Sequence, residues 1–264
     1  MGQQASSVGK MARRAGVDVI PVDIGINTKE TLPGVRDCKV MQGTRDFLQE
    51  PAMTEEEALQ ALSVGIDLVR ECKDKGYQLI GTGEMGIGNT TTSTAVAAAL
   101  LDLAVEQVTG KGAGLTDEAL KRKCRVIKEA IEKYSLRDAD AFTILKTVGG
   151  LDIAGLTGVF IGAAIEQIPV VIDGVISAVA ALLAETLCKG AVNYMIPSHK
   201  SRELAETAIM KKLHLDPVLD ADMALGEGTG AVMMMSLLDV ALGVYLQGAS
   251  FANFEIEQYK RYEE

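Results

Sequence analysis

Two glycine-rich loops in this sequence each carry a carboxylate that could do acid–base chemistry. Glu84 follows Gly83 in GTGEMGIGNTT, and a second glutamate, Glu227, lies in LGEGTGA. Glycines let the atoms of a substrate approach the backbone closely. Apolar neighbours such as Met85 can raise the pKa of a carboxyl group until it serves as a base. The alternative is structural, because acidic residues commonly stand at helix N-termini.

The first loop leads into a helix whose start could bind an anion. Gly86, Gly88 and Asn89 leave backbone N–H groups free where the small-residue run TTTSTAVAAALL begins. A helix N-terminus attracts a single phosphate, and the hydroxyl of Thr90 adds a polar group there. A purely structural strand-to-helix turn with threonine capping is the alternative interpretation.

Two familiar phosphate-binding patterns fit this loop only by glycine spacing. The G-x-G-x-x-G pattern of dinucleotide sites requires an acidic residue at the end of the next strand. Asp102 has about the right spacing but closes a helix, and Glu84 would repel a pyrophosphate. A P-loop requires a lysine where Asn89 stands. Neither pattern is met, so a site for a single phosphate and a structural turn remain the two interpretations of this loop.

Composition bounds the kind of protein and its partners. The chain has 264 residues, 48% hydrophobic, with 26 basic and 36 acidic residues and a net charge of −10. Such a charge disfavours nucleic acid, and the basic run at 120–125 is typical of a solvated helix face. Four dispersed cysteines and two histidines leave little for a zinc site or a catalytic triad, so we expect no metal. The polar start of the chain and free thiols favour the cytoplasm.

The elements that position these loops alternate between strands and helices. Short apolar runs predict strands at Val17–Ile26, Tyr77–Ile80, Val170–Asp173 and Ala191–Pro197. A capping box, Thr54 with Glu57, predicts the helix before the second of these, with a stripe that includes Leu59. The apolar region 155–184 is interrupted by polar residues and proline, which indicates buried helix, strand and helix, not a membrane span.

This alternation predicts an α/β fold with a Rossmann-like, mostly parallel sheet flanked by helices. Ligands bind such sheets at the carboxyl ends of the strands. We therefore expect three loops to meet there, namely Gly81–Thr90, the turn at Asp173–Gly174, and Leu225–Ala231. A fourth glycine run, GKGAG, precedes a helix for which Thr116 is the expected N-cap.

Five motifs together resemble one enzyme family. GTGEMGIGNTT, VTGKGAG with LKRKCRVI, PVVIDGVISAVAALL, SHKS and LGEGTGA occur in this order. The chain resembles the nicotinate-nucleotide:dimethylbenzimidazole phosphoribosyltransferases from Gly9 to about Phe254. The resemblance implies phosphoribosyl transfer from nicotinate mononucleotide to 5,6-dimethylbenzimidazole, giving α-ribazole 5′-phosphate and nicotinate for the lower ligand of cobalamin. The ring nitrogen of the donor is already cationic, so neither a metal nor a cofactor is expected.

The resemblance also implies roles for individual residues. Glu227 matches the general base that takes a proton from the benzimidazole. Lys123 matches a phosphate-contacting lysine, although by its helical position alone it would be a border residue with its ammonium in solvent. Gly86 and the helix start after it match the phosphate cradle. The implied substrate-binding residues are Glu84, Gly86, Asn89, Thr90, Lys123, Asp173, Ser201, Leu225 and Gly226.

The sequence departs from the family pattern in three places. After SHKS the family continues with an acidic residue, glycine and a second histidine, whereas this chain reads RELA. Thr92 stands where a proline is common. The family also carries about 90 further N-terminal residues, less than one typical domain, with much of the base-pocket wall. We thus expect a nucleotide-binding domain over residues 1–230 and, over residues 231–264, the C-terminal helix of a small helical domain.

Two alternatives to the complete reaction stay open. The chain could be a nucleotide-binding remnant, or a subunit inactive without a separate N-terminal segment. It could also transfer the phosphoribosyl group to another base, such as adenine or a phenol. In either case we expect small-molecule substrates, no nucleic acid or membrane partner, and a homodimer.

Overall fold

A three-stranded parallel sheet lies at the centre of the fold. The computed structural model describes residues 2–3, 5–110, 114–248 and 253. The sheet has the order β3 (Ile80–Gly81), β4 (Val170–Ile172) and β5 (Met195–Pro197). All its pairs are parallel, with Ile80 opposite Val170 and Val170 opposite Met195. The predicted α/β class is confirmed, although the strands are shorter than their apolar runs.

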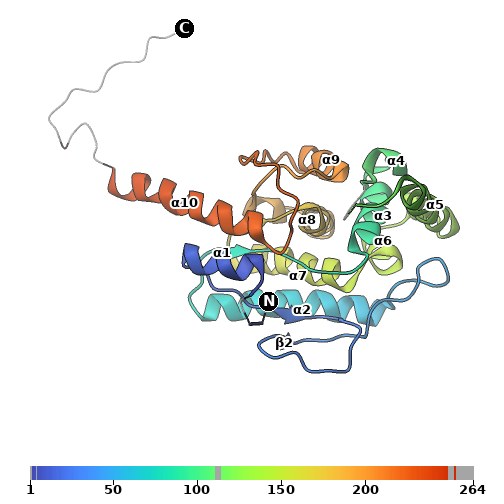
Figure 1. The fold of residues 1–264 in the computed structure, drawn as a ribbon, viewed down its shortest axis with the longest axis horizontal. Helices are drawn as coiled ribbons and strands as arrows, with labels where there is room; N and C mark the ends of the chain where they lie inside the picture. The colour runs from blue at the N-terminus through green and yellow to red at the C-terminus, as the bar shows by residue number, and fades with distance from the viewer. Residues whose placement is uncertain (1, 4, 111–113, 249–252, 254–264) are drawn as a thin grey trace, which may run out of the picture.

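Helices pack around this sheet and form most of the core (Figure 1). The most extensive contact joins α2 (Glu55–Asp74) to α7 (Leu151–Glu166). A Cβ on Gly65 would lie 2.0 Å from the carbonyl oxygen of Gly155, so the two backbones touch only because glycine is present. The region 155–184 is folded as α7, β4 and α8 (Val175–Leu187) in the core, as predicted.

The helix α2 begins as predicted and buries most of the predicted face, apart from Leu59. Thr54 and Glu57 form a complete capping box. Leu62 and Val69 of the predicted stripe are buried, whereas Leu59 is 51% exposed. The small residues Ala58, Ala61 and Gly65 widen the buried face where α2 approaches α7 closely.

The first predicted strand, Val17–Ile26, is wrong in its length and in its sheet. Only β1 (Val22–Asp23) is extended, and it pairs in parallel with β2 (Arg36–Asp37), apart from the central sheet. The carboxylate of Asp23 accepts hydrogen bonds from the N–H groups of Gly25 and Ile26 at 3.0 and 2.8 Å. These bonds turn the chain out of strand geometry directly after Asp23.

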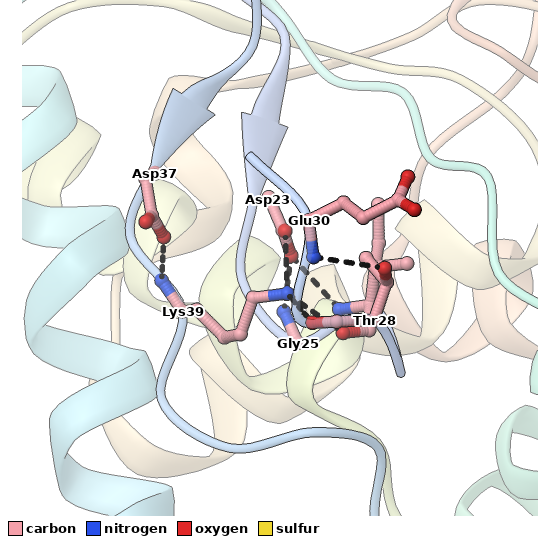
Figure 2. A network of polar contacts seen from close by, with 7 residues as sticks. Asp23, Gly25, Thr28, Glu30, Asp37 and Lys39 are labelled. Carbon is pink, nitrogen blue, oxygen red and sulfur yellow. Dashed lines mark hydrogen bonds and ion pairs between the residues drawn. The ribbon is translucent and has the colours of Figure 1, made fainter. Parts of the chain in front are cut away.

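A single lysine holds the loop that follows β1 (Figure 2). The ammonium of Lys39 donates to the carbonyl oxygens of Ile26 and Thr28 at 2.8 and 2.9 Å, and it lies 2.9 Å from Asp23 Oδ2. Because Asp23 is buried, this ion pair and its hydrogen bonds lock the loop more firmly than a surface pair would. The network is structural and lies among residues 23–39.

The remaining helices complete the layers on the sheet. Three of them, α3, α5 and α10, were expected from the sequence, and Thr116 caps α5 as predicted. They are α1 (Ser7–Ala15), α3 (Asn89–Leu101), α4 (Val105–Val108), α5 (Asp117–Lys133), α6 (Ala141–Val148), α9 (Leu204–Leu213) and α10 (Thr229–Gln247), with short 3₁₀ turns at Leu136–Asp138 and Ala191–Tyr194.

The helix α10 packs only at its beginning. Its first turns contact α1, β3 and β4, and its second half extends away from the rest of the molecule (Figure 1). Among the described residues it is the one helix long and apolar enough to cross a membrane by length and composition, and 28% of its apolar window is buried. The predicted helix at the C-terminus is confirmed to Gln247, and residues 254–264 lie outside the described part. The division at residue 230 stays a prediction.

Candidate active site

The two glycine-rich loops touch each other at the carboxyl edge of the sheet. A Cβ on Gly83 would lie 2.5 Å from the nitrogen of Gly228. Gly226 and Gly228 have φ values of +73° and +90°, in the left-handed region that favours glycine. Gly83 and Gly228 are 145 positions apart in the sequence. The contact between their loops brings Glu84 close to Gly226, because a Cβ on Gly226 would lie 3.5 Å from Glu84 Oε1.

Glu84 lies in a surrounding that retains a proton. Burial raises the pKa of Glu84 to about 7; the amide of Asn89 opposes this shift, and the carboxylates of Asp152 and Asp173 add to it. The Nδ2 group of Asn89 donates to Glu84 Oε2 and also to Asp152 Oδ2, the latter at 2.9 Å. Glu84 can therefore accept or release a proton near neutral pH.

Asp152 is a site residue that sequence reasoning missed. It stands in the first turn of α7, and only the preceding Gly149-Gly150 pair marks that turn in the sequence. It also explains Gly86, because a Cβ there would lie 2.8 Å from both Asn89 Nδ2 and Asp152 Oδ2. The glycine thus makes room for the bridge between two acidic side chains.

The start of α3 has the features of an anion site. Gly88 is its N-cap with a φ of +83°, and it contributes no side-chain cap. The buried ammonium of Lys123 donates to Thr90 Oγ1 at 3.1 Å and to the carbonyl oxygen of Gly110 at 3.5 Å. Burial lowers the pKa of Lys123, and the nearby carboxylate of Glu203 opposes that shift. The lysine points inward to Thr90, so its interpretation as a border residue was wrong; residues 111–113 of GKGAG lie outside the described part.

Asp173 holds the second loop through its backbone. Its buried carboxylate accepts hydrogen bonds from the N–H groups of Gly228, Gly230 and Ala231 at 3.0, 2.8 and 3.2 Å. Burial raises the pKa of Asp173, whereas these three bonds and the proximity of His199 lower it. Both carboxylate oxygens are thus engaged at the start of α10. The geometry makes Asp173 a residue that positions the loop of Glu227.

Glu227 sits at a conformationally unusual position. Its φ is +62°, which is uncommon for a residue with a side chain and is found at functional sites. Its Oε2 accepts a hydrogen bond from the N–H of Val8 at 3.1 Å, in the first turn of α1. This hydrogen bond from the first turn of α1 therefore fixes the direction of the Glu227 side chain.

Apolar side chains are exposed beside these carboxylates. Leu225, from the second loop, and Met85 and Ile87, from the first, are all largely exposed. Large exposed apolar groups on neighbouring loops are typical of a surface that receives an apolar or aromatic ligand.

Ser201 lies at the start of α9, where two glutamates contact it. Its N–H donates to Glu206 Oε2 at 3.0 Å, and its Oγ accepts from the N–H of Glu203 at 3.1 Å. The carboxyl group of Glu203 crowds Gly110, since a Cβ there would lie 1.9 Å from Glu203 Oε2. Through Gly110 the start of α9 adjoins Lys123. Sequence reasoning missed both glutamates, because two acidic residues near a helix start are ordinary.

Within the described residues, no group of three or more His, Cys, Asp or Glu side chains is placed to hold a metal ion. Of the predicted residues, the structure gathers Glu84, Gly86, Asn89, Gly226 and Glu227 around the two loops, and Thr90 with Lys123 around the start of α3. Asp173 lies beneath the second loop. The residues therefore form a proton-transfer part and an anion-binding part, both reached from the first loop.

Comparisons with known proteins identify the family to which the chain is similar. A family model described as phosphoribosyltransferase matches residues 1–256. The chain is 48% identical over 255 residues to the nicotinate-nucleotide–dimethylbenzimidazole phosphoribosyltransferase of Clostridium acetobutylicum, covering 97% of this chain and 72% of the relative. It is 46% identical over 256 residues to the enzyme of the same name in Chloroflexus aggregans, with the same two coverages.

Solved structures give the same result for the fold. The crystal structure of CobT from Thermus thermophilus superimposes with a TM-score of 0.92 at 34% identity, covering 98% of this chain and 77% of that one. A second structure from the same organism, titled as the nicotinate-nucleotide–dimethylbenzimidazole phosphoribosyltransferase, gives a TM-score of 0.90 at 34% identity and covers 98% of this chain and 76% of that one.

Proposed function

Because the chain belongs to this phosphoribosyltransferase family, we propose that it transfers the phosphoribosyl group of nicotinate mononucleotide to 5,6-dimethylbenzimidazole. The products are α-ribazole 5′-phosphate and nicotinate. The observation that carries the proposal is the contact between the two loops, which brings Glu84 next to the loop of Glu227 and adjoins the start of α3. The two parts are joined within the first loop, since Asn89, which donates to Glu84, directly precedes Thr90.

The phosphate end of the nucleotide is assigned to the start of α3. There the N–H groups of the first turn and the ammonium of Lys123 supply positive charge. Two hydroxyl groups are assigned to the same phosphate. One is that of Thr90, which accepts a hydrogen bond from Lys123, and the other is that of Ser201, which adjoins Lys123 through Glu203 and Gly110. This assignment is supported by the burial of Lys123, because a buried ammonium is stabilised by an anion that binds beside it.

The reacting end of the nucleotide is assigned to the two glutamates. One benzimidazole nitrogen attacks C1′ of the ribose, and the C1′–N bond to nicotinate breaks with its electron pair moving to the cationic ring nitrogen. The other benzimidazole N–H loses its proton, which Glu227 accepts in this proposal. Attack opposite the leaving group inverts C1′ and gives the α product. Holding two flat rings on either side of one ribose is largely a matter of orientation.

The proposal is tested with Glu227→Gln, which keeps the size of the side chain and removes its basicity. We expect turnover to fall by roughly 10²- to 10⁴-fold, the usual contribution of a general base, while calorimetry finds nicotinate mononucleotide bound with unchanged affinity. Glu129→Gln, an exposed residue on α5, is the matched control and should leave turnover unchanged.

Calorimetry on the unaltered chain separates the complete reaction from the alternatives. Binding of both nicotinate mononucleotide and dimethylbenzimidazole, with formation of α-ribazole phosphate, supports the proposal. Binding of the nucleotide alone, without product, would identify a nucleotide-binding protein instead. Competition among dimethylbenzimidazole, adenine and a phenol tests the choice of base, for which Leu225, Met85 and Ile87 favour a flat apolar ring.

A homodimer in the cytoplasm completes the proposal. Its support is the exposed apolar second half of α10, where Val240, Val244, Tyr245 and Leu246 are all more than two-thirds exposed. An apolar surface of this kind is typical of an interface. Light scattering after gel filtration measures the mass of the particle, and a monomer over a wide concentration range would contradict the dimer.

A further inference from the structure

Glu206 is a buried carboxyl group with one unpaired oxygen. It lies in the first turn of α9 and is 3% exposed. Its Oε2 accepts from the N–H of Ser201 at 3.0 Å, whereas Oε1 has no hydrogen-bond partner among the described residues. An unsatisfied buried polar group costs about 1–3 kcal/mol, so such a group in a native structure calls for an explanation.

A second unpaired polar atom stands at the same edge of the sheet. Ser177 Oγ, in the first turn of α8, is buried and has no partner among the described residues. The helices α8 and α9 follow the adjacent strands β4 and β5 and pack on each other. Gly174, the N-cap of α8, has open space, since a Cβ there would meet no atom within 4 Å. The two unpaired atoms thus belong to helices that follow the carboxyl ends of adjacent strands, where parallel sheets bind their ligands.

The charges around Glu206 favour its acid form. Burial raises the pKa of Glu206 to about 7, against the hydrogen bonds from Ser201, and the carboxylate of Asp173 raises it further. Of the neighbouring charged groups, His199 interacts with Asp173, and Glu203 interacts with Lys123. Within the described part of the chain three helices pack on α9, and one of them, α3, carries no titratable residue. In α8 the carboxylate of Glu185 accepts from backbone N–H groups. In α4 the carboxylate of Glu106 forms an ion pair with Lys128.

We propose that Glu206 binds the nucleotide phosphate as a protonated carboxyl group, with the Oε1 hydroxyl donating to a phosphate oxygen, so that nucleotide binding takes up a proton. The proton comes from solvent and adds to the carboxylate, and no other bond changes. The ligand's identity rests on the proposed function. The location rests on Ser201 and on Gly110, which connect Glu206 and Glu203 to the ammonium of Lys123.

Proton uptake is measured by calorimetry with nicotinate mononucleotide in two buffers of different ionisation enthalpy. For a group with a pKa of about 7, we expect uptake of about half a proton at pH 7 in the wild type. Glu206→Gln keeps a donor of the same shape but cannot titrate, so that uptake should disappear while binding persists. Glu129→Gln should retain the full uptake.

The pH dependence of affinity provides a second measurement. Between pH 6 and pH 8, the Kd of the wild type should rise about tenfold relative to that of Glu206→Gln, because only the protonated form binds. The phosphate's own titration, near pH ~6, affects both proteins equally.

The possible failures are distinguishable. Equal uptake and equal pH dependence in wild type and Glu206→Gln would overturn the inference and leave the proposed function intact. No binding of nicotinate mononucleotide at any pH would overturn the proposed function, and inorganic phosphate then serves as the probe for proton-linked binding. If Glu206→Gln does not fold, infrared difference spectra of the wild type decide, since binding should add a protonated-carboxyl band.

Discussion

The helices α3 and α10 begin in nearly the same way but differ in the electrostatics at their starts. Each follows a glycine-rich loop and has a left-handed glycine as N-cap, Gly88 with φ +83° and Gly228 with φ +90°. At α10 the buried carboxylate of Asp173 accepts from three backbone N–H groups. At α3, within the described residues, no side chain accepts from the N–H groups of Asn89 and Thr90, and Lys123 lies beside them.

The difference shows that a glycine loop before a helix does not by itself define a phosphate site. Both starts carry the same partial positive charge from the helix dipole. At the start of α10 the carboxylate of Asp173 accepts from the free N–H groups, whereas at the start of α3 the ammonium of Lys123 adds positive charge. The sequence pattern is shared, so the residue that approaches each start from elsewhere in the fold decides its use.

The largest expected effect comes from removing the internal carboxylate. Asp173→Ala leaves three buried N–H groups without an acceptor, and we expect the free energy of unfolding to fall by about 3–5 kcal/mol. Urea denaturation measures this loss, and Asp173→Asn should lose less because its amide oxygen still accepts. Were the start of α10 a second phosphate site, Asp173→Ala would gain affinity for inorganic phosphate; we expect no gain.

The second effect tests the start of α3. Lys123→Met keeps the length of the side chain and removes the charge, and we expect the Kd for nicotinate mononucleotide to rise roughly 10- to 150-fold, from loss of a charged hydrogen bond of about 1.5–3 kcal/mol. Stability should hold or rise, because the buried ammonium is no longer desolvated. Lys128→Met, on the exposed side of the same helix, is the control. An unchanged Kd in Lys123→Met would contradict the assignment of the nucleotide phosphate to the start of α3.

The sequence predicts those parts of the fold and of the site that depend on residues close together in the chain. The loops of Glu84 and Glu227, the strand Val170–Asp173 and the capping box of α2 depend on short-range patterns, and the sequence identified them. The roles of Asp152 and Glu206 depend on helices that pack only after β3, β4 and β5 are paired. No spacing rule links Asn89 to Asp152, which lie 63 positions apart.

Errors in the predicted elements have the same origin. Val17–Ile26 has the composition of a buried strand, but the hydrogen bonds of Asp23 and the contacts of Lys39 with a loop more than ten residues away end it early. The exposure of Leu59 depends on how α2 packs on α7 through Gly65 and Gly155, which helical periodicity alone does not predict. The inward direction of Lys123 is likewise set by Thr90 on another helix.

The third effect concerns the proton held by Glu84. Since its folded pKa is raised to about 7, the native state binds more protons than the unfolded state between about pH 4.5 and pH 7. The free energy of unfolding therefore decreases as pH rises through this window, by at most about 1.4 kcal/mol per pH unit for one group. Glu84→Gln should reduce this slope in urea denaturation, and a slope equal to that of the wild type would contradict the raised pKa.

The smallest effect separates the contribution of Asp152 to that raised pKa from the contribution of burial. Burial is the larger cause and Asp152 a smaller one, acting across Asn89, whose Nδ2 group donates to both carboxylates. Asp152→Asn removes only the charge, so the pKa of Glu84 should decrease by less than one unit, and the acidic limb of the pH–rate profile should move to lower pH. At the start of α10, among the described residues, no bridged second carboxylate is present, because Asp173 itself accepts from the backbone N–H groups. The same substitution at the exposed Asp67 on α2 should leave the profile in place. A shift to higher pH in Asp152→Asn would mean that the amide of Asn89, released from Asp152, had turned away from Glu84, and that the bridge mattered more than the charge.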